Sequence, residues 1–146
     1  MPESLTILIR YHDPDIEKLS VTANGDWVDL RCADTVHLDA GQFAILPLGV
    51  SMRLPDGYEA HIAPRSSTFK RWGILQTNGV GIIDNSYSGN NDIWGMPVYA
   101  TRETTICKGD RVCQFRIMRR MEPVHFEEVP HLDGDDRGGF GSTGIS

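Results

Sequence analysis

Short stretches of alternating hydrophobic and polar residues recur along the chain. The clearest are residues 27–33, 58–62 and 111–117, where apolar side chains fall mainly on every second position. Because the side chains of a strand point alternately to its two faces, this period of two predicts strands with one face in a core. Gln114 is an exception, a polar residue expected either in a largely buried strand or at a sheet edge.

Further short apolar runs bounded by turn residues predict the remaining strands. Pro97 places its strand at an edge or a bulge, because proline cannot donate to a sheet ladder. Helix is expected for one turn at 14–19, capped by Asp13, and for residues 69–72 after a Ser-Ser-Thr run with N-cap chemistry. Many strands and little helix predict an all-β sandwich or barrel of jelly-roll type. The additional strands are expected at residues 5–9, 43–46, 50–54, 80–83, 92–100, 104–107 and 124–129.

The composition changes after residue 130. Residues 133–146 carry five glycines, and Phe140 is their only aromatic residue. Such a segment cannot bury enough apolar surface to build a core. We therefore predict a β domain at residues 1–130 and a flexible C-terminal arm at 131–146, with a frayed terminus as the competing interpretation.

Two segments carry candidate chemistry. Residues 79–90 join an apolar strand to turn residues, with Asp84 at the strand end and Tyr87 near the tip. This pattern predicts a functional hairpin, and an ordinary surface hairpin is the alternative. Arg65 lies beside the start of the short predicted helix, where a cation and free N–H groups suit a phosphate. A capped turn with a solvated Arg65 is an equal alternative.

Composition narrows the range of functions. At 146 residues the chain fits one domain, and a net charge of −6 without a basic stripe argues against nucleic acid as the main partner. Three cysteines without Cys-x-x-Cys spacing and five scattered histidines argue for reduced thiols and against a protein metal site. No apolar run approaches the roughly 20 residues of a membrane helix, and no signal pattern opens the chain. We therefore expect no membrane association and a cytoplasmic protein.

Five segments, in order, resemble the motifs of the homotrimeric dUTPases, the dUTP diphosphatases. The match spans about residues 24 to 144 and is similar to a Gram-positive bacterial or phage branch of that family. This sequence differs from the family pattern at several places. Ser67 replaces the usual glycine of the second motif, and Arg137 lies closer than usual to the Gly-Gly pair. Residues 91–94 are extra, and the sequence does not decide whether they enter the site. The five segments are Asp29-Leu30-Arg31-Cys32-Ala33, Ala63-Pro64-Arg65-Ser66-Ser67, Asn78 to Gly89 with its Gly-x-Ile-Asp-x-x-Tyr-x-Gly core, Gly109 to Phe115, and Gly138 to Gly144.

The resemblance implies hydrolysis of dUTP to dUMP and pyrophosphate by water attack at the α-phosphorus. This reaction removes dUTP from the nucleotide pool and supplies dUMP for thymidylate synthesis. By resemblance, Asp84 is the general base for the water. The triphosphate would itself hold most of a bound Mg²⁺, with Asp29 reaching the ion through a water. The residues expected on the phosphates are Arg65, Ser66, Ser67 and Gln114.

The same resemblance assigns the nucleoside contacts and the arm. Tyr87 would pack on the sugar and exclude a 2′-hydroxyl, while main-chain groups of the predicted hairpin would read uracil. Each site of the homotrimer would be assembled from three chains. The hairpin residues expected on the nucleoside are Asn78, Gly81 and Ile83. The arm residues expected to close over the nucleotide are Arg137, Phe140, Gly141 and Ser142.

Two other functions stay open. The related dCTP deaminases share the fold but need a glutamate beside the pyrimidine. The predicted hairpin has none, since Glu103 and Glu122 are remote from it in sequence. A regulatory binding protein, as for some phage members of the family, would act through a protein partner that the sequence does not identify.

Overall fold

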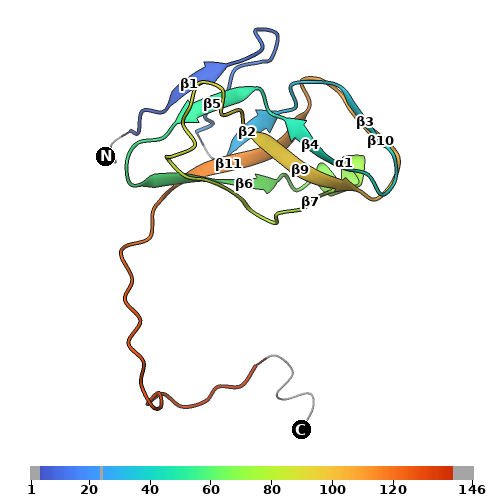
Figure 1. Cartoon of the computed structure of the whole chain (residues 1–146). Helices are drawn as coiled ribbons and strands as arrows, with labels where there is room; N and C mark the ends of the chain where they lie inside the picture. Colours follow the sequence, from blue (N-terminus) through green and yellow to red (C-terminus); the bar gives the residue numbers. More distant parts are fainter. Residues whose placement is uncertain (1–3, 24, 140–146) are drawn as a thin grey trace.

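The computed structural model describes residues 4–23 and 25–139. This part of the chain consists of strands joined by turns and one helix of five residues (Figure 1). The elements are β1 (Leu8–Tyr11), β2 (Val28–Arg31), β3 (Val36–Leu38), β4 (Phe43–Pro47), β5 (Val50–Arg53), β6 (Tyr58–Pro64), α1 (Thr68–Trp72), β7 (Ile74–Gln76), β8 (Gly81–Ile83), β9 (Gly95–Ala100), β10 (Thr104–Ile106) and β11 (Arg111–Arg119).

The strands form two larger antiparallel sheets and two short strand pairs. One sheet has the order β2-β11-β6-β8 and the other β4-β9-β7, while β1 pairs with β5 and β10 with β3. Strands far apart in sequence therefore lie side by side, as β2 and β11 do (Figure 1). Because buried residues of both larger sheets belong to one hydrophobic core, the predicted all-β, jelly-roll-like fold is confirmed.

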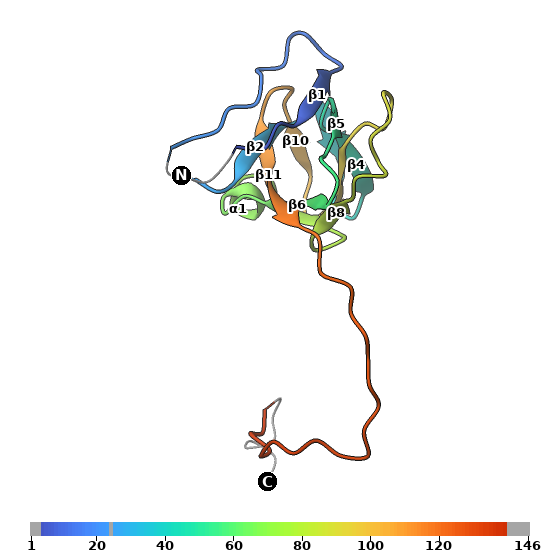
Figure 2. The same ribbon diagram turned by 90° about the vertical axis from the view of Figure 1, so that its left-hand side faces the viewer.

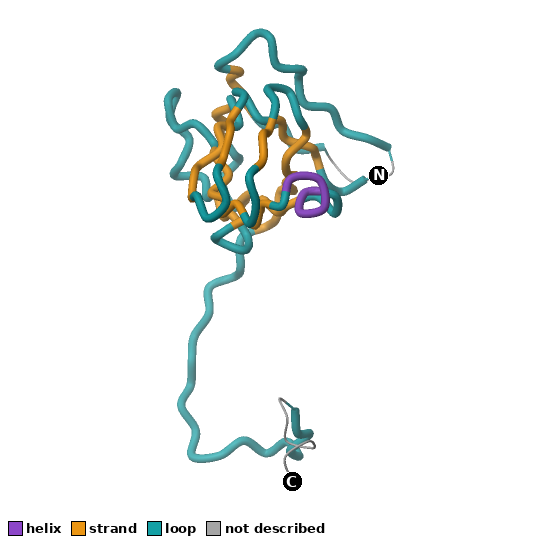
Figure 3. Tube along the Cα trace, turned by 90° about the vertical axis from the view of Figure 1, so that its right-hand side faces the viewer, coloured by secondary structure: helices purple, strands orange, loops and turns teal. Residues whose placement is uncertain are grey.

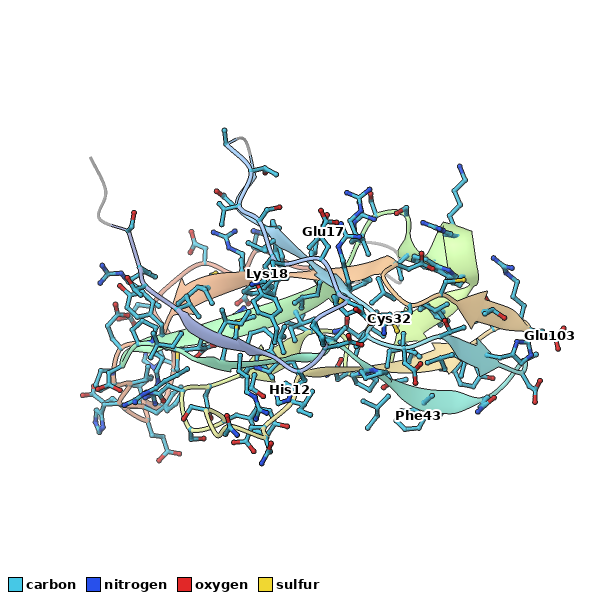
Figure 4. The ribbon with its side chains drawn as sticks, turned by 90° about the horizontal axis from the view of Figure 1, so that it is seen from above. His12, Glu17, Lys18, Cys32, Phe43 and Glu103 are labelled. Atoms are coloured by element: carbon cyan, nitrogen blue, oxygen red, sulfur yellow. The ribbon has the colours of Figure 1, made fainter. Side chains whose placement is uncertain are left out.

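The core lies between the two larger sheets. Trp94 is 1% exposed and meets Phe115 of β11 edge to face, with ring centroids 5.2 Å apart. Cys32 is buried among the strands (Figure 4), and this burial raises the pKa of its thiol. Phe43 of β4 instead lies on the outside of the molecule (Figure 4) and is 57% exposed. The β4-β9-β7 sheet thus carries apolar side chains on its outer face as well as in the core.

The predicted hairpin at residues 79–90 is wrong. β8 pairs with β6, where Ile62 faces Gly81, whereas the next strand, β9, pairs with β4 and β7 in the other sheet. Residues 84–94 are therefore a loop that crosses from one sheet to the other. The apolar pattern identified the strand but not its partner, because strand pairing is a tertiary contact.

Pro97 does not lie at a sheet edge, since β9 is the central strand of its sheet. The main-chain N–H of Thr77 donates to Pro97 O at 3.0 Å, just after β7 ends at Gln76. Proline has no N–H with which to return this bond. The hydrogen-bond ladder between β7 and β9 therefore ends at Pro97. Because no N–H is required of Pro97 there, the sheet tolerates a proline in its central strand.

The alternation predicted for β11 breaks at its first residues. The strand register shifts between Arg111 and Cys113, which marks a β-bulge. Val112 and Cys113 are consequently both buried, while Arg111 is exposed. A simple period of two had placed Arg111 and Cys113 on the same face of the strand. The bulge puts them on different faces.

The shortest elements were the least predictable. β3 and β7 have three residues each, too few to show a period. Residues 14–19 form a turn and no helix: Asp13 Oδ1 accepts the main-chain N–H of Asp15 at 2.8 Å. Within the described residues, no helix is long and apolar enough to cross a membrane.

The chain leaves the β domain after β11. Arg120 N–H donates to Gly57 O at 2.9 Å, and residues 121–139 contain no helix or strand. The strand predicted at 124–129 is therefore wrong. Figure 2 and Figure 3 show this segment extending away from the body of the molecule. Phe126 and Leu132 within it are 89% and 83% exposed.

Candidate active site

β11 brings three of the predicted site residues together. In the sheet register, Gln114 faces Asp29 of β2 on one side and Ala63 of β6 on the other. Arg65 follows β6 directly, and its Nε lies 3.1 Å from Asp29 Oδ1. Gln114 Nε2 donates to Pro64 O at 3.1 Å. The residues expected on the phosphates and metal thus gather at one end of this sheet, while their roles stay predictions.

Asp29 lies between two arginines. Besides its contact with Arg65, its Oδ2 is 3.5 Å from Arg111 Nη1, and Arg65 Nη1 donates to Arg111 O at 3.3 Å. Arg31, two residues further along β2, pairs with Glu17 and not with Asp29. Two guanidinium groups against one carboxylate leave local positive charge, which suits an anionic ligand. Arg111 lies in the fourth motif segment, Gly109 to Phe115, but the sequence assigned it no role.

Thr68 holds the loop that carries Arg65. Its Oγ1 accepts the main-chain N–H of Arg65 at 2.8 Å and donates to Val112 O at 3.0 Å, and the residue is fully buried. Ser67 occupies the N-cap position of α1 without a side-chain cap hydrogen bond, so the predicted N-cap chemistry is wrong. In the described part of the chain, neither the Ser66 nor the Ser67 hydroxyl has a hydrogen-bond partner. Both are therefore available to a ligand.

Asp84 directly follows β8 and is exposed to solvent. Its Oδ1 accepts the hydroxyl of Ser86 and also the main-chain N–H of Ser86, the latter at 2.8 Å. The hydroxyl bond first, and the N–H bond second, hold the pKa of Asp84 below the usual range of a carboxyl group. Asp84 is therefore ionised at neutral pH and can orient a water and accept its proton.

Ser86→Ala is expected to raise the pKa of Asp84 towards its usual value, because the largest cause of the depression is removed. The wild-type carboxylate should therefore stay charged at a lower pH than that of the variant. Carbon NMR of the Asp84 carboxyl during an acid titration measures both midpoints. Ser88→Ala, in the same loop, is the matched control and should leave the midpoint unchanged. Identical midpoints for wild type and Ser86→Ala would contradict this assignment.

Asp84 and Tyr87 line a hollow of about 590 Å³. Tyr87 Oη donates to Ile93 O at 3.0 Å, and Ile93 itself lines the hollow. Of the extra residues 91–94, Ile93 therefore reaches this hollow, whereas Trp94 is buried in the core. The remaining wall is mostly apolar and includes Ile45, Ile82 and Ile83. An apolar hollow with one carboxylate and one aromatic ring suits a small polar molecule with a flat or ring-shaped part.

Asn78 lies in the turn that leads into β8. Its carbonyl accepts the main-chain N–H of Val80 at 2.7 Å, and Gly79 adopts a φ of 69° that favours glycine. A Cβ at Gly81 would lie 3.2 Å from Ile62 Cβ and 3.4 Å from Asn78 Nδ2. Glycine at position 81 therefore lets the turn and β6 approach each other closely.

The two groups of predicted residues do not meet within one chain. Neither Arg65 nor Gln114 lines the hollow beside Asp84. Among the described residues, no hydrogen bond or ion pair links these two to Asp84 or Tyr87. Arg137 belongs to the segment that extends away from the body (Figure 2). Outside the described residues lie Phe140, Gly141 and Ser142.

The surroundings of Asp29 exclude direct ligation of a magnesium ion and leave contact through a bridging water. Mg²⁺ prefers oxygen ligands and usually keeps several waters when it binds phosphates. Both carboxylate oxygens of Asp29 already face guanidinium groups, which leaves water-mediated contact as the compatible mode. In the described chain, one other set of side chains is close enough to hold an ion, and it is exposed at the β3–β10 end, where Figure 4 shows Glu103. That set is His37, Asp39 and Glu103.

Comparison with known proteins decides the family. A family model described as dUTPase matches residues 27–144. The chain belongs to the dUTPase family. It is 52% identical over 140 residues to the SPbeta prophage-derived deoxyuridine 5'-triphosphate nucleotidohydrolase YosS of Bacillus subtilis strain 168, which covers 96% of this chain and 99% of that protein. It is 38% identical over 141 residues to the deoxyuridine 5'-triphosphate nucleotidohydrolase of Streptomyces griseus, covering 94% and 80% of the two proteins.

Solved structures of dUTPases share the fold. The dUTPase of Staphylococcus bacteriophage 80alpha with dUPNHPP matches with a TM-score of 0.77 and 18% identity, covering 96% of this chain and 99% of that chain. The dUTPase from Streptococcus mutans matches with a TM-score of 0.69 and 23% identity, covering 80% and 98%. A mutant dUTPase from phage phi11 of S. aureus, with a TM-score of 0.74 and 17% identity over 88% and 99%, coordinates a structural Mg(II) ion.

Proposed function

We propose that this member of the dUTPase family hydrolyses dUTP to dUMP and pyrophosphate. The observation that carries the proposal is Asp84, an ionised carboxylate beside Tyr87 in a hollow of about 590 Å³. The 52% identity to a relative named for this activity supports the choice of substrate. The reaction removes dUTP from the nucleotide pool, supplies dUMP for thymidylate synthesis, and places the enzyme with that pool in the cytoplasm.

Asp84 acts on the attacking water. Ser86 occupies Oδ1 with two hydrogen bonds, so Oδ2 is the oxygen that accepts the proton. The water oxygen bonds to the α-phosphorus, the bond from that phosphorus to the bridging oxygen breaks, and pyrophosphate leaves with the bonding electrons. Pairing of β8 with β6 fixes the direction from which the carboxylate approaches.

The phosphate contacts come from the C-terminal end of β6, around Arg65, in the same sheet as β8. Its guanidinium, the hydroxyls of Ser66 and Ser67, and the amide of Gln114 position and neutralise the triphosphate, which is most of what phosphoryl transfer asks of a protein. Thr68 keeps Arg65 in place through its two hydrogen bonds. A triphosphate-bound Mg²⁺ would offset charge on the phosphate oxygens, and Asp29 would hold it through a water.

The nucleoside contacts come from the hollow and from the arm. Tyr87, held by its bond to Ile93 O, packs against the sugar and excludes a 2′-hydroxyl by shape. Main-chain groups of residues 78–83 read uracil, and they reject cytosine because its donor and acceptor are exchanged. The arm carrying Arg137 closes over the nucleotide, with Phe140 stacking on the base.

We also propose a homotrimer with shared sites. Phe43, Tyr99 and Leu75 form one exposed apolar row across the outer face of the β4-β9-β7 sheet. The segment beyond β11 exposes Phe126 and Leu132 in the same way. Contiguous exposed apolar surface of this kind is typical of contacts with another chain. The separation of Asp84 from Arg65 in one chain supports the same assembly.

Pyrophosphate release from dUTP with Mg²⁺ tests the proposal. We expect kcat/KM for dUTP to exceed that for dCTP and UTP by at least about 100-fold, because a mismatched base or an extra hydroxyl leaves buried groups unpaired or clashing. In the described chain no glutamate lines the hollow, so dCTP should release no ammonia. Ammonia from dCTP, or no pyrophosphate from dUTP, would overturn the proposal in favour of a deaminase or a binding protein.

A regulatory partner is a separate prediction. Phage dUTPases, that of bacteriophage 80alpha among them, control the transfer of virulence genes. By analogy, a protein partner of this chain, such as a repressor, is recoverable by pull-down with the intact protein. Nucleic acid and membrane are not part of the proposed function.

A further inference from the structure

Gln76, the last residue of β7, connects the two larger sheets. Its Nε2 donates to Ile62 O of β6 at 3.0 Å and to Gly79 O at 3.3 Å. β7 belongs to the β4-β9-β7 sheet, whereas β6 belongs to the β2-β11-β6-β8 sheet. A single amide group therefore fastens the turn at residues 77–80 to a strand of the opposite sheet.

The other hydrogen bonds of this turn are mostly local. Gly79 N–H donates to Gln76 O at 3.2 Å, and Val80 N–H donates to Asn78 O at 2.7 Å. The bond from Thr77 N–H to β9 holds only the first residue of the turn. These bonds close the turn on itself, so the Gln76 amide is the side-chain tie that holds the turn to β6, beside the pairing of Gly81 with Ile62.

The Gln76 amide is retained although it is incompletely paired. Its Oε1 is buried and has no hydrogen-bond partner among the described residues. A buried carbonyl oxygen without a donor destabilises a fold, and an apolar side chain of similar length would avoid that cost. The cost of the unpaired Oε1 offsets part of the stability gained from the two Nε2 bonds, which leaves the position of the turn as their distinctive effect.

We propose that Gln76 is a positioning residue that sets how the turn at 77–80 meets the base of the nucleotide, an inference that rests on the proposed function. β8 has three residues, so the turn and Asp84 lie at its two ends, about 10 Å apart. Loss of the Gln76 amide therefore shifts the groups that meet the base without moving the carboxylate that acts on water. The effect falls on KM and base preference, with little change in kcat.

Gln76→Met, which keeps the length of the side chain and removes the amide, tests this role. We expect KM for dUTP to rise about 10-fold, kcat to stay within about threefold, and the preference for dUTP over dCTP to fall by a similar factor of about 10, as suits the loss of two hydrogen bonds. Gln76→His, which returns a ring N–H at similar reach, should recover part of both losses. Amide hydrogen exchange at Val80, read independently of turnover, should be faster in Gln76→Met than in wild type.

Gln42→Met is the matched control. Gln42 Oε1 accepts the main-chain N–H of Asp39 at 2.9 Å and closes a turn before β4, so its loss removes a similar bond elsewhere. This variant should keep wild-type KM, base preference and Val80 exchange. An active wild type whose Gln76→Met variant behaves like Gln42→Met would overturn this inference alone. Absence of dUTP hydrolysis by the wild type would overturn the proposed function. In that case the positioning role is still tested by hydrogen exchange, and an unchanged exchange rate at Val80 in Gln76→Met would overturn it as well.

Discussion

Replacing Asp84 by asparagine is expected to lower kcat for dUTP hydrolysis by about 10²- to 10⁴-fold, the usual range for loss of a general base. Asparagine keeps an Oδ1 that can accept both bonds from Ser86, so the loop should keep its conformation. What disappears is an ionised oxygen able to accept the proton of the attacking water. The affinity for a non-hydrolysable dUTP analogue should change little, because base and phosphates bind elsewhere.

Asp56→Asn is the matched control for this experiment. Asp56 is an exposed carboxylate whose Oδ1 accepts a hydrogen bond from Asn85 Nδ2 at 3.1 Å. Asn85 is the residue that follows Asp84 in the sequence. The control removes the same charge close by and should keep wild-type turnover. Pyrophosphate release measured for both variants separates the two roles. Turnover of Asp84→Asn near that of wild type would remove Asp84 from the mechanism.

Arg65→Ala is expected to lower kcat/KM for dUTP by about 10²- to 10³-fold, as for the loss of one donor to a charged transition state. The substitution removes the guanidinium that reaches the phosphates and leaves Asp29 with Arg111 as its remaining partner. Arg71→Ala is the matched control, because Arg71 lies on α1 and contacts Asp110 and the Trp72 ring instead. Its activity should stay near that of wild type.

Mixing the two inactive variants gives a stronger test. If Asp84 and Arg65 of one site come from different chains, co-refolding equal amounts of Asp84→Asn and Arg65→Ala should restore about a quarter of wild-type sites, as expected for random mixing in a ring. If both residues act within one chain, every site carries a defect and no activity returns. Pyrophosphate release before and after co-refolding, with sedimentation to establish the oligomer, distinguishes the two results.

The β-strands that alternate most regularly were the most predictable part of this protein. β2, β6 and β11 each place every second side chain in the core, and this produces an alternation of apolar and polar residues that is visible in the local sequence. The bulge between Arg111 and Cys113 escaped the same reasoning, because an extra residue in one strand depends on what the partner strands allow. The strand expected at 124–129 failed for a related reason, since its apolar side chains have no partner sheet in the described chain.

The candidate site divides in the same way. The five motifs carried Asp84, Tyr87, Arg65 and Gln114, and their resemblance to the dUTPases already implied the reaction. The motifs did not indicate Thr68 or Gln76, whose importance comes from bonds to Val112 O and Ile62 O in distant strands. They also suggested a hairpin at 79–90, where the structure has a strand of one sheet followed by a loop to the other.

The sequence by itself thus determined the fold class, the family and the residue types that carry the chemistry, because these follow from local periodicity and from motifs contiguous in the chain. Only the tertiary structure decided that Asp84 shares a hollow with Ile93, that Asp29 is held by Arg65 and Arg111, and that these two groups do not meet within one chain. Those facts depend on which strands pair and which loops cross between sheets. Such contacts join residues far apart in sequence, so no local pattern records them.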